Sequence, residues 1–248
     1  MAGELKDNRG RGEAEWRWPS VHPEGRKFGL IGLAVTAVAT FLAGPWLGLP
    51  LLALSTFIFA FFRDPERVVP QGEGMILAPA DGLISLIKLV PPPLELQGDD
   101  ENGRGLGAEP VIRISIFMSV FDVHINRAPV SGTVERIVYI PGLFLNADLD
   151  KASEENERQH ILIAQANGQR VGFTQIAGLI AKRIVPFVKP GDLVAAGQRV
   201  GLIRFGSRVD VYLPAGTDAR VLLGQKVIAG ETVLAETGRQ LLIEGVSL

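Results

Sequence analysis

The longest uncharged stretch of the chain runs from Phe28 to Phe62, 35 consecutive positions without Asp, Glu, Lys or Arg. Pro45 lacks a backbone donor and disfavours helix at Gly44, so a turn is expected there, between arms of 16 residues at Phe28–Ala43 and Leu47–Phe62. At about 1.5 Å per residue each helical arm reaches roughly 24 Å, slightly less than the roughly 30 Å hydrocarbon core of a bilayer. The alternative is a helical hairpin buried in a soluble core. A segment without a polar face favours membrane association.

Positive charges flank this segment on both sides. Arg26 and Lys27 precede it, and Arg63 and Arg67 follow it. Because positive residues are retained on the cytoplasmic side, both ends of the hairpin are expected there. Residues 1–27 mix charges with glycine and proline, which predicts a polar flexible tail and fits poorly with a cleaved signal peptide. The segment therefore predicts a protein at the cytoplasmic face of the cell membrane.

Composition excludes several kinds of site. The 248 residues include no cysteine, which rules out disulfides, thiolate zinc sites, iron–sulfur clusters and a cysteine nucleophile. The three histidines, His22, His124 and His160, form no H-x-x-x-H pair, and no metal site is predicted. With 25 basic and 27 acidic residues the net charge is −2, which gives no electrostatic basis for binding nucleic acid.

After the apolar segment the sequence changes to short β-branched runs interrupted by glycine and proline. Strands are expected at 75–77, 83–90, 111–125, 133–140, 161–165 and 171–188, with an exposed loop at 91–109 and only short helices. If the strand at 111–125 continues, its period of two places Asp122, His124 and Asn126 on one face. His124 is the only histidine in a strand-like motif, whereas His160 is expected at the surface or rim.

An internal repeat occupies the C-terminal third. Val188–Val200 and Val221–Val233 both read V-x-x-G-x-x-V-x-A-G-x-x-V, with glycines where tight turns need positive φ and valines that face a core. Such a pair resembles the two halves of a barrel-sandwich hybrid, the fold of lipoyl carriers. The chain is therefore predicted to be mainly β (α+β), with a barrel-sandwich-hybrid-like β domain at 63–248 behind an N-terminal hydrophobic helical hairpin at 28–62.

Four further motifs occur in chain order. They are A-P-A-D-G at Ala78–Gly82, F-M-S-V-F-D-V-H-I-N-R-A-P-V-S-G at Phe117–Gly132, K-A-S-E-E-N-E-R at Lys151–Arg158, and R-F-G-S-R-V-D-V-Y-L-P at Arg204–Pro214. Together they resemble the short form of the phosphatidylserine decarboxylase family, over essentially residues 28–236.

The resemblance implies a proenzyme that cuts itself between Gly206 and Ser207. Ser207 attacks the preceding carbonyl, elimination releases the upstream chain, and the remaining residue becomes a pyruvoyl group, the covalent cofactor of the family. The mature protein would consist of a β chain, 1–206, and an α chain, 207–248.

Serine is a weak nucleophile until a base takes its proton, and imidazole suits that task near neutral pH. The resemblance implies that His124 is the base and that Asp81 orients it, in the manner of a Ser-His-Asp triad. Asp122 is a rival on geometry, because a period of two places it beside His124. The resemblance leaves open which group returns a proton after decarboxylation, and His124 is a candidate for both steps.

The implied substrate is an anionic seryl phospholipid, phosphatidylserine, whose decarboxylation yields phosphatidylethanolamine and carbon dioxide. Arg127, Arg158 and Arg208 are candidates for binding the phosphodiester, because guanidinium groups match phosphate oxygens, although each could instead form a structural ion pair. A decarboxylase of another seryl lipid and a non-enzymatic membrane-anchored adaptor are the competing interpretations. The adaptor class normally carries a long coiled coil, which this sequence lacks. The sequence leaves open whether the protein forms a homo-oligomer.

Overall fold

The structure, a computed structural model, describes residues 17–98, 105–145, 152–178, 183–204, 206–240 and 243–246. Most of the predicted N-terminal tail, residues 1–16, lies outside this description. The chain forms two compact units, one that ends at Val68 and one that starts at Val69.

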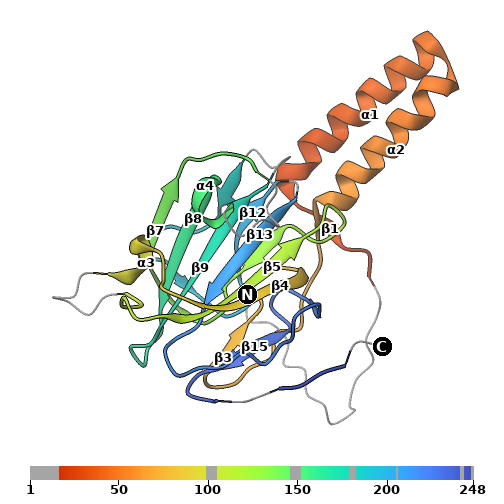
Figure 1. The fold of residues 1–248 in the computed structure, drawn as a ribbon. Coiled ribbons are helices and arrows are strands. Elements are labelled where there is room, and N and C mark those ends of the chain that lie inside the picture. Colours follow the sequence, from red (N-terminus) through yellow and green to blue (C-terminus); the bar gives the residue numbers. More distant parts are fainter. Residues whose placement is uncertain are drawn as a thin grey trace. The chain divides into compact units, whose positions relative to one another are not determined.

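The first unit is a helical hairpin, with α1 at Pro23–Ala43 and α2 at Pro45–Phe61 (Figure 1). The turn falls at Gly44, as predicted, with φ of +78°. Helix α1 begins five residues before the predicted arm, because the His22 side chain accepts a hydrogen bond from the Glu24 amide and Pro23 occupies the first helical turn. The two-residue strands β1, Ser20–Val21, and β2, Arg63–Asp64, pair at the open end of the hairpin.

Small residues allow the two helices to approach closely. A Cβ atom at Gly29 would lie 2.4 Å from the Phe59 ring, and one at Gly48 would lie 2.0 Å from Thr40 Oγ1. The hydroxyl groups of Thr36 and Ser55 lie 3.2 Å apart across the interface. Thr36 and Ser55 are thus buried between the helices, and large apolar side chains are exposed on the outside of the hairpin.

The second unit is mainly β. Its strands are β3 Met75–Leu77, β4 Gly82–Val90, β5 Val111–Met118, β6 Ile125–Arg127, β7 Gly132–Ile140, β8 Arg158–Ala164, β9 Arg170–Ala177, β10 Ile184–Pro186, β11 Leu193–Val194, β12 Arg199–Ile203, β13 Ser207–Tyr212, β14 Lys226–Val227 and β15 Val233–Glu236. The helices in the described part of this unit are single turns, α3 at Leu94–Gln97 and α4 at Ala152–Glu155. The prediction of a mainly β domain with only short helices is confirmed.

Eight strands form one curled sheet in the order β11-β7-β8-β9-β13-β5-β4-β14 (Figure 1). Two smaller sheets, β10-β12-β6 and β15-β3, complete the unit. The large sheet consists of two matching halves that meet between β9 and β13. Strands β9, β8, β7 and β11 of one half have as counterparts β13, β5, β4 and β14 of the other. Strands β4 and β7 both have nine residues and both follow an A-P-x-x-G turn. The unit is therefore built as two related halves, as expected for a barrel-sandwich hybrid.

The C-terminal repeats make equivalent contacts in the two halves. Gly191 donates its amide to Val134 O at 2.8 Å, and Gly224 donates to Ile84 O at 2.9 Å. The four repeat glycines all have positive φ, between +74° and +92°, at Gly191, Gly197, Gly224 and Gly230. The predicted turn role of these glycines is confirmed.

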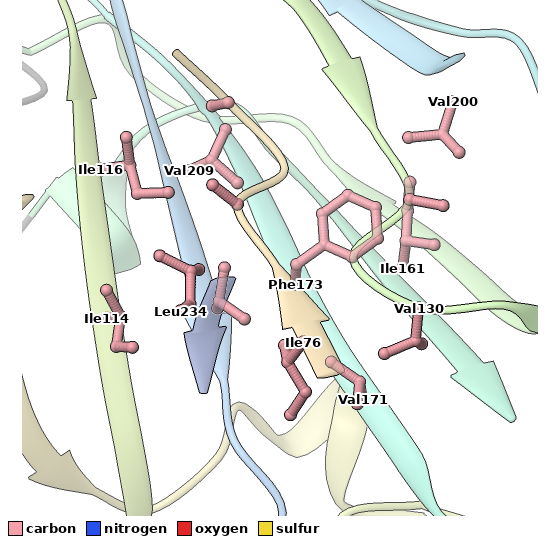
Figure 2. Packing of buried hydrophobic residues seen from close by; sticks show 14 of the residues in the cluster. Ile76, Ile114, Ile116, Val130, Ile161, Val171, Phe173, Val200, Val209 and Leu234 are labelled. Atoms are coloured by element: carbon pink, nitrogen blue, oxygen red, sulfur yellow. The ribbon is translucent and has the colours of Figure 1, made fainter. Parts of the chain in front are cut away.

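The core lies between the concave face of the large sheet and the two smaller sheets. Figure 2 shows side chains from both sources that meet there: Ile114, Ile116, Ile161, Val171, Phe173 and Val209 from the large sheet, with Ile76, Val200 and Leu234 from the smaller ones. All of these side chains are buried. Successive residues of β13 alternate between this core and the outer face of the sheet.

Two predicted strands are interrupted. The run at 111–125 divides into β5 and β6, because a turn at 119–122 closes when the Asp122 carboxylate accepts hydrogen bonds from the Ser119 amide at 2.8 Å and hydroxyl at 2.7 Å. The run at 171–188 divides into β9 and β10, and residues 179–182 between them lie outside the description. Asp122 and His124 are therefore not neighbours on one strand face, which corrects the period-two expectation.

Candidate active site

Ser207 is the first residue of β13, at one end of the large sheet. It pairs with Met118 of β5 on one side and Ala177 of β9 on the other. The residue is fully buried, and its hydroxyl donates a hydrogen bond to the Met118 sulfur at 3.3 Å. Gly206 has φ of +54°, in the left-handed region that favours glycine. The predicted cleavage junction thus joins a turn residue to a central strand.

His124 lies just before β6 and is fully buried. Its Nδ1 lies 2.9 Å from the backbone oxygen of Asp122. Because a carbonyl oxygen can only accept, Nδ1 carries the proton in this contact and Nε2 is the basic nitrogen of the neutral ring. The main chain of Asp122 thus contacts Nδ1, and the Asp122 carboxylate is used in the turn with Ser119.

Asp81 lies in the A-P-A-D-G turn that leads into β4. Its carboxylate accepts a hydrogen bond from the Ala229 amide at 2.8 Å. In the other half of the domain, the equivalent turn places the Ser131 hydroxyl on the Ala196 amide, also at 2.8 Å. Asp81 thus has a structural contact that a serine makes elsewhere, and its predicted role toward His124 stays a prediction.

Asp81 nevertheless lies at the same end of the sheet as Ser207. A Cβ at Gly82 would lie 2.1 Å from the backbone oxygen of Phe117, so the turn closely approaches the end of β5. Met118, the next residue of β5, pairs with Ser207. The turn of Asp81, the end of β5 and the start of β13 therefore lie next to one another at this end of the sheet.

The K-A-S-E-E-N-E-R motif contacts the same end of the sheet on the β9 side of Ser207. Asn156 is fully buried and donates to Ala177 O at 2.7 Å and Leu145 O at 2.8 Å, while its own oxygen accepts from the Leu145 amide. Glu157 O accepts from the Ala177 amide at 2.9 Å. Since Ala177 pairs with Ser207, this motif fixes the residue beside the candidate nucleophile.

The three predicted phosphate-binding arginines differ in environment. Arg158 is half-buried and donates to Glu154 O and Asn156 O, and Arg127 is buried with its guanidinium on Gly197 O at 2.8 Å. Arg208 is 1% exposed and binds Asp210 through Nε at 2.8 Å and Nη2 at 3.1 Å. A phosphate group would have to displace that buried carboxylate to reach Arg208.

A buried polar cluster lies on the outer face of the same strands. It includes the Arg208–Asp210 pair, with Arg113 Nε 3.9 Å from Asp210. His160 is also buried there, which corrects its expected place at the surface, and its Nδ1 lies 2.8 Å from Thr174 Oγ1. Burial lowers the pKa of His160 to about 4, so the ring is neutral at physiological pH.

Three buried amides on the core side were not predicted as site residues. Gln159 Nε2 donates to Gln175 Oε1 at 2.9 Å, and Gln175 Nε2 donates to Asn126 Oδ1 at 2.7 Å. Asn126 Nδ2 in turn lies 3.8 Å from the Met118 sulfur that binds Ser207. The available sequence signal was Asn126 in the H-I-N-R segment, and nothing local distinguishes the two glutamines from surface residues of a strand.

Comparison with known proteins identifies the family of the chain. The family profile of phosphatidylserine decarboxylase matches residues 54–235. The phosphatidylserine decarboxylase proenzyme of Novosphingobium aromaticivorans is 66% identical over 247 residues, which cover 99% of this chain and 98% of that protein. Proteins of the same name from Erythrobacter litoralis and Zymomonas mobilis are 63% and 57% identical, with at least 95% of each chain covered.

The fold and these comparisons thus define a carboxy-lyase whose curated relatives are named as proenzymes. The chain is a member of the phosphatidylserine decarboxylase family.

Proposed function

We propose that this protein decarboxylates phosphatidylserine to phosphatidylethanolamine, with a pyruvoyl group made from its own Ser207. The observation that carries the proposal is the Gly206–Ser207 junction, where a left-handed glycine precedes a buried serine at the start of a central strand. The relatives named as proenzymes support a self-processing step.

Self-cleavage needs a nucleophile, a base and a bond placed between them. Ser207 Oγ adds to the carbonyl carbon of Gly206, the C–N bond breaks, and an ester with a free amine replaces the amide. Loss of the Ser207 Cα proton then expels Gly206 as a carboxylate, and addition of water releases ammonia and leaves a ketone. His124 is the proposed base, through the Nε2 that remains unprotonated when Nδ1 donates to Asp122 O.

The sheet explains how the new chain end stays in place after cleavage. Strand β13 pairs along its length with β5 and β9, from Ser207 to Tyr212. The C-terminal segment is also held by β14 against β4 and by β15 against β3. Cutting the bond before Ser207 breaks none of these ladders, so the α chain remains bound to the β chain.

The residue at position 207 is well placed to hold an electrophile away from water. It is fully buried between Met118 and Ala177, with His124 also buried. When formed, the pyruvoyl group supplies an electron sink for the pair of electrons left as carbon dioxide departs. The proposed contributions of the chain are to exclude water, to hold a proton at His124, and to bind the phosphodiester through Arg127 or Arg158.

We also propose that the hairpin holds the enzyme at the membrane that contains its substrate. Among the described residues, α1 is the helix long and apolar enough to cross a bilayer, and α2 is shorter but also apolar. Phe41 is 88% and Trp46 90% exposed near the turn, which favours an apolar medium around the hairpin. Arg26 and Arg63 at the other end support a cytoplasmic face.

Intact-protein mass spectrometry of the purified full-length chain tests the cofactor. We expect two chains that divide between Gly206 and Ser207, the smaller lighter by one ammonia than a peptide that begins with serine. Ser207→Ala should give one intact chain without decarboxylase activity. The control variant Ser85→Ala, at a serine of strand β4, should be processed normally. A single intact chain from an active parent preparation would remove the pyruvoyl mechanism.

Substrate identity is tested with vesicles that contain phosphatidylserine, with phosphatidylethanolamine and carbon dioxide as measured products. Matched vesicles with a seryl lipid of opposite glycerol stereochemistry provide the comparison. Preference for the second lipid would place the protein with another seryl-lipid decarboxylase, and no product from either would favour the adaptor interpretation.

A further inference from the structure

A chain of buried polar side chains runs from the middle of the large sheet to Ser207. It begins at Gln159 on β8, continues through Gln175 on β9 to Asn126 on β6, and ends at Met118 on β5. The three amide residues are at most 3% exposed. This series of hydrogen bonds thus links two sheets, because β8, β9 and β5 belong to the large sheet whereas β6 belongs to the β10-β12-β6 sheet.

The direction of this chain is set by its last member. A thioether sulfur carries no proton and can only accept a hydrogen bond, so the Asn126 group that faces Met118 must be its NH₂. The Asn126 oxygen then faces Gln175 and must be met by a donor, and the same reasoning applies to the Gln175 oxygen and Gln159. Every amide is therefore oriented, and the donor end points toward the candidate nucleophile.

The sulfur of Met118 accepts from two donors, the Asn126 amide and the Ser207 hydroxyl at 3.3 Å. Methionine has three rotatable side-chain bonds and adapts to its surroundings, so its sulfur needs a partner to stay in one place. Asn126 provides that partner. The serine side chain in turn depends on the sulfur for its hydrogen bond within the buried site.

We infer that Asn126 is a positioning residue for self-cleavage, which acts through the Met118 sulfur to hold the Ser207 hydroxyl in place until His124 takes its proton. The inference rests on the proposed self-cleavage at Gly206–Ser207. Asn126 also lies two residues after His124 on the same segment, so the amide chain that ties β6 to β9 keeps the base and the nucleophile in register. Because small displacements of reacting groups have large effects on rate, loss of this support is expected to slow self-cleavage.

The test is the first-order rate at which newly made full-length chain is cut, followed by gel and mass spectrometry. Met118→Leu keeps the side-chain volume and removes the acceptor, and Asn126→Asp keeps an acceptor for Gln175 and removes the donor. We expect each variant to slow cleavage by about tenfold. Met75→Leu on β3 and Asn167→Asp in an exposed turn are the matched controls, with rates within about twofold of the parent.

A double variant separates positioning from general support of the fold. If Asn126 acts through Met118, the Met118→Leu, Asn126→Asp double variant is cut no more slowly than the slower single variant, because both changes break one path. Independent structural effects would instead multiply. Hydroxylamine, which cuts an ester after it forms, should not restore cleavage of either variant, because the slowed step is the attack that makes the ester.

Three outcomes would overturn the inference: single variants cut at the parent rate, multiplied effects in the double variant, or full rescue by hydroxylamine. A parent chain that is never cut would contradict the proposed function itself, whereas a normally cut parent with normally cut variants contradicts the positioning role alone.

Discussion

His160 occupies a place that a polar, titratable side chain rarely takes. It lies on β8 beside the apolar run Ile161–Ile163, and that run gave no sign of which face the histidine would join. The structure gives the ring a partner in Thr174 on the neighbouring strand and buries it on the outer face of the sheet. A cross-strand partner of this kind follows from register, which local sequence does not encode.

The burial of His160 predicts a loss of stability in mild acid. In the folded protein its pKa is about 4, lowered mainly by desolvation, whereas in the unfolded chain the ring takes a proton near pH 6.5. Between these values the unfolded state binds more protons, so the free energy of unfolding falls as pH decreases from 6.5 to 4, by about 3 kcal/mol in total.

Thermal melts of the detergent-solubilised protein across this range measure that loss. His160→Gln should flatten the dependence relative to the parent. Equal slopes for the parent and His160→Gln would show that other groups control the acid limit.

Ser207 and His124 are predicted site residues on the basis of motifs, and the structure adds the surroundings in which these motifs lie. A serine after glycine is common in hairpin turns, and only the strand that follows makes this one buried on both sides. Asn126, Gln159 and Gln175 were missed because their significance depends on contacts between β6, β8 and β9. The periodicity of one strand does not predict which residues meet across two sheets.

At the scale of elements, turns and repeats were more predictable than strand ends. The glycines at 191, 197, 224 and 230 sit where the repeat placed them, because a tight turn with positive φ has a strong sequence signature. The break between β5 and β6 was missed, since the apolar pattern continues through it. A local side-chain contact, Asp122 to Ser119, ends the strand instead.

The helical hairpin offers a direct test of packing at this scale. A cysteine-free chain allows Thr36→Cys with Ser55→Cys as a single engineered pair, at positions whose hydroxyl oxygens lie 3.2 Å apart. We expect nearly complete disulfide formation on mild oxidation, measured as loss of maleimide labelling in the denatured protein.

Adding Gly48→Val to this pair should reduce the cross-link by about fivefold, because its Cβ would meet Thr40 Oγ1 at 2.0 Å and force the helices apart. Leu49→Val, at an exposed neighbouring position, is the control. Equal cross-linking in all three backgrounds would show that close packing at Gly48 does not set the helix separation.

At the scale of the whole molecule, the proposed reactive centre lies in one of two related halves of the β unit. In one half β8 and β9 are joined by a short hairpin at 165–169, and their counterparts β5 and β13 end at Met118 and begin at Ser207 without being joined to each other. The chain before Ser207 arrives from the small sheet through β12. Ser207 therefore lies at a strand start that no hairpin links to the paired strand β5.

The division into two compact units predicts that processing and membrane attachment can be separated. The residues proposed for cleavage, Asp81, His124, Asn126 and Ser207, all lie after Val69, and the core of that unit is built from its own strands. A chain that starts at Val69 should therefore fold and cut itself at Gly206–Ser207 at a rate within about threefold of the full chain.

The same truncated protein should remain in the supernatant when membranes are sedimented, whereas the full chain pellets with them. Its decarboxylation of phosphatidylserine in vesicles should fall by about tenfold or more, while activity on a short-chain, water-soluble phosphatidylserine stays close to that of the full protein, because only access to the bilayer is lost. Continued sedimentation of the truncated chain would move the membrane contact to the β domain. Failure to cut itself would show that the hairpin contributes to the folded active site as well as to its location.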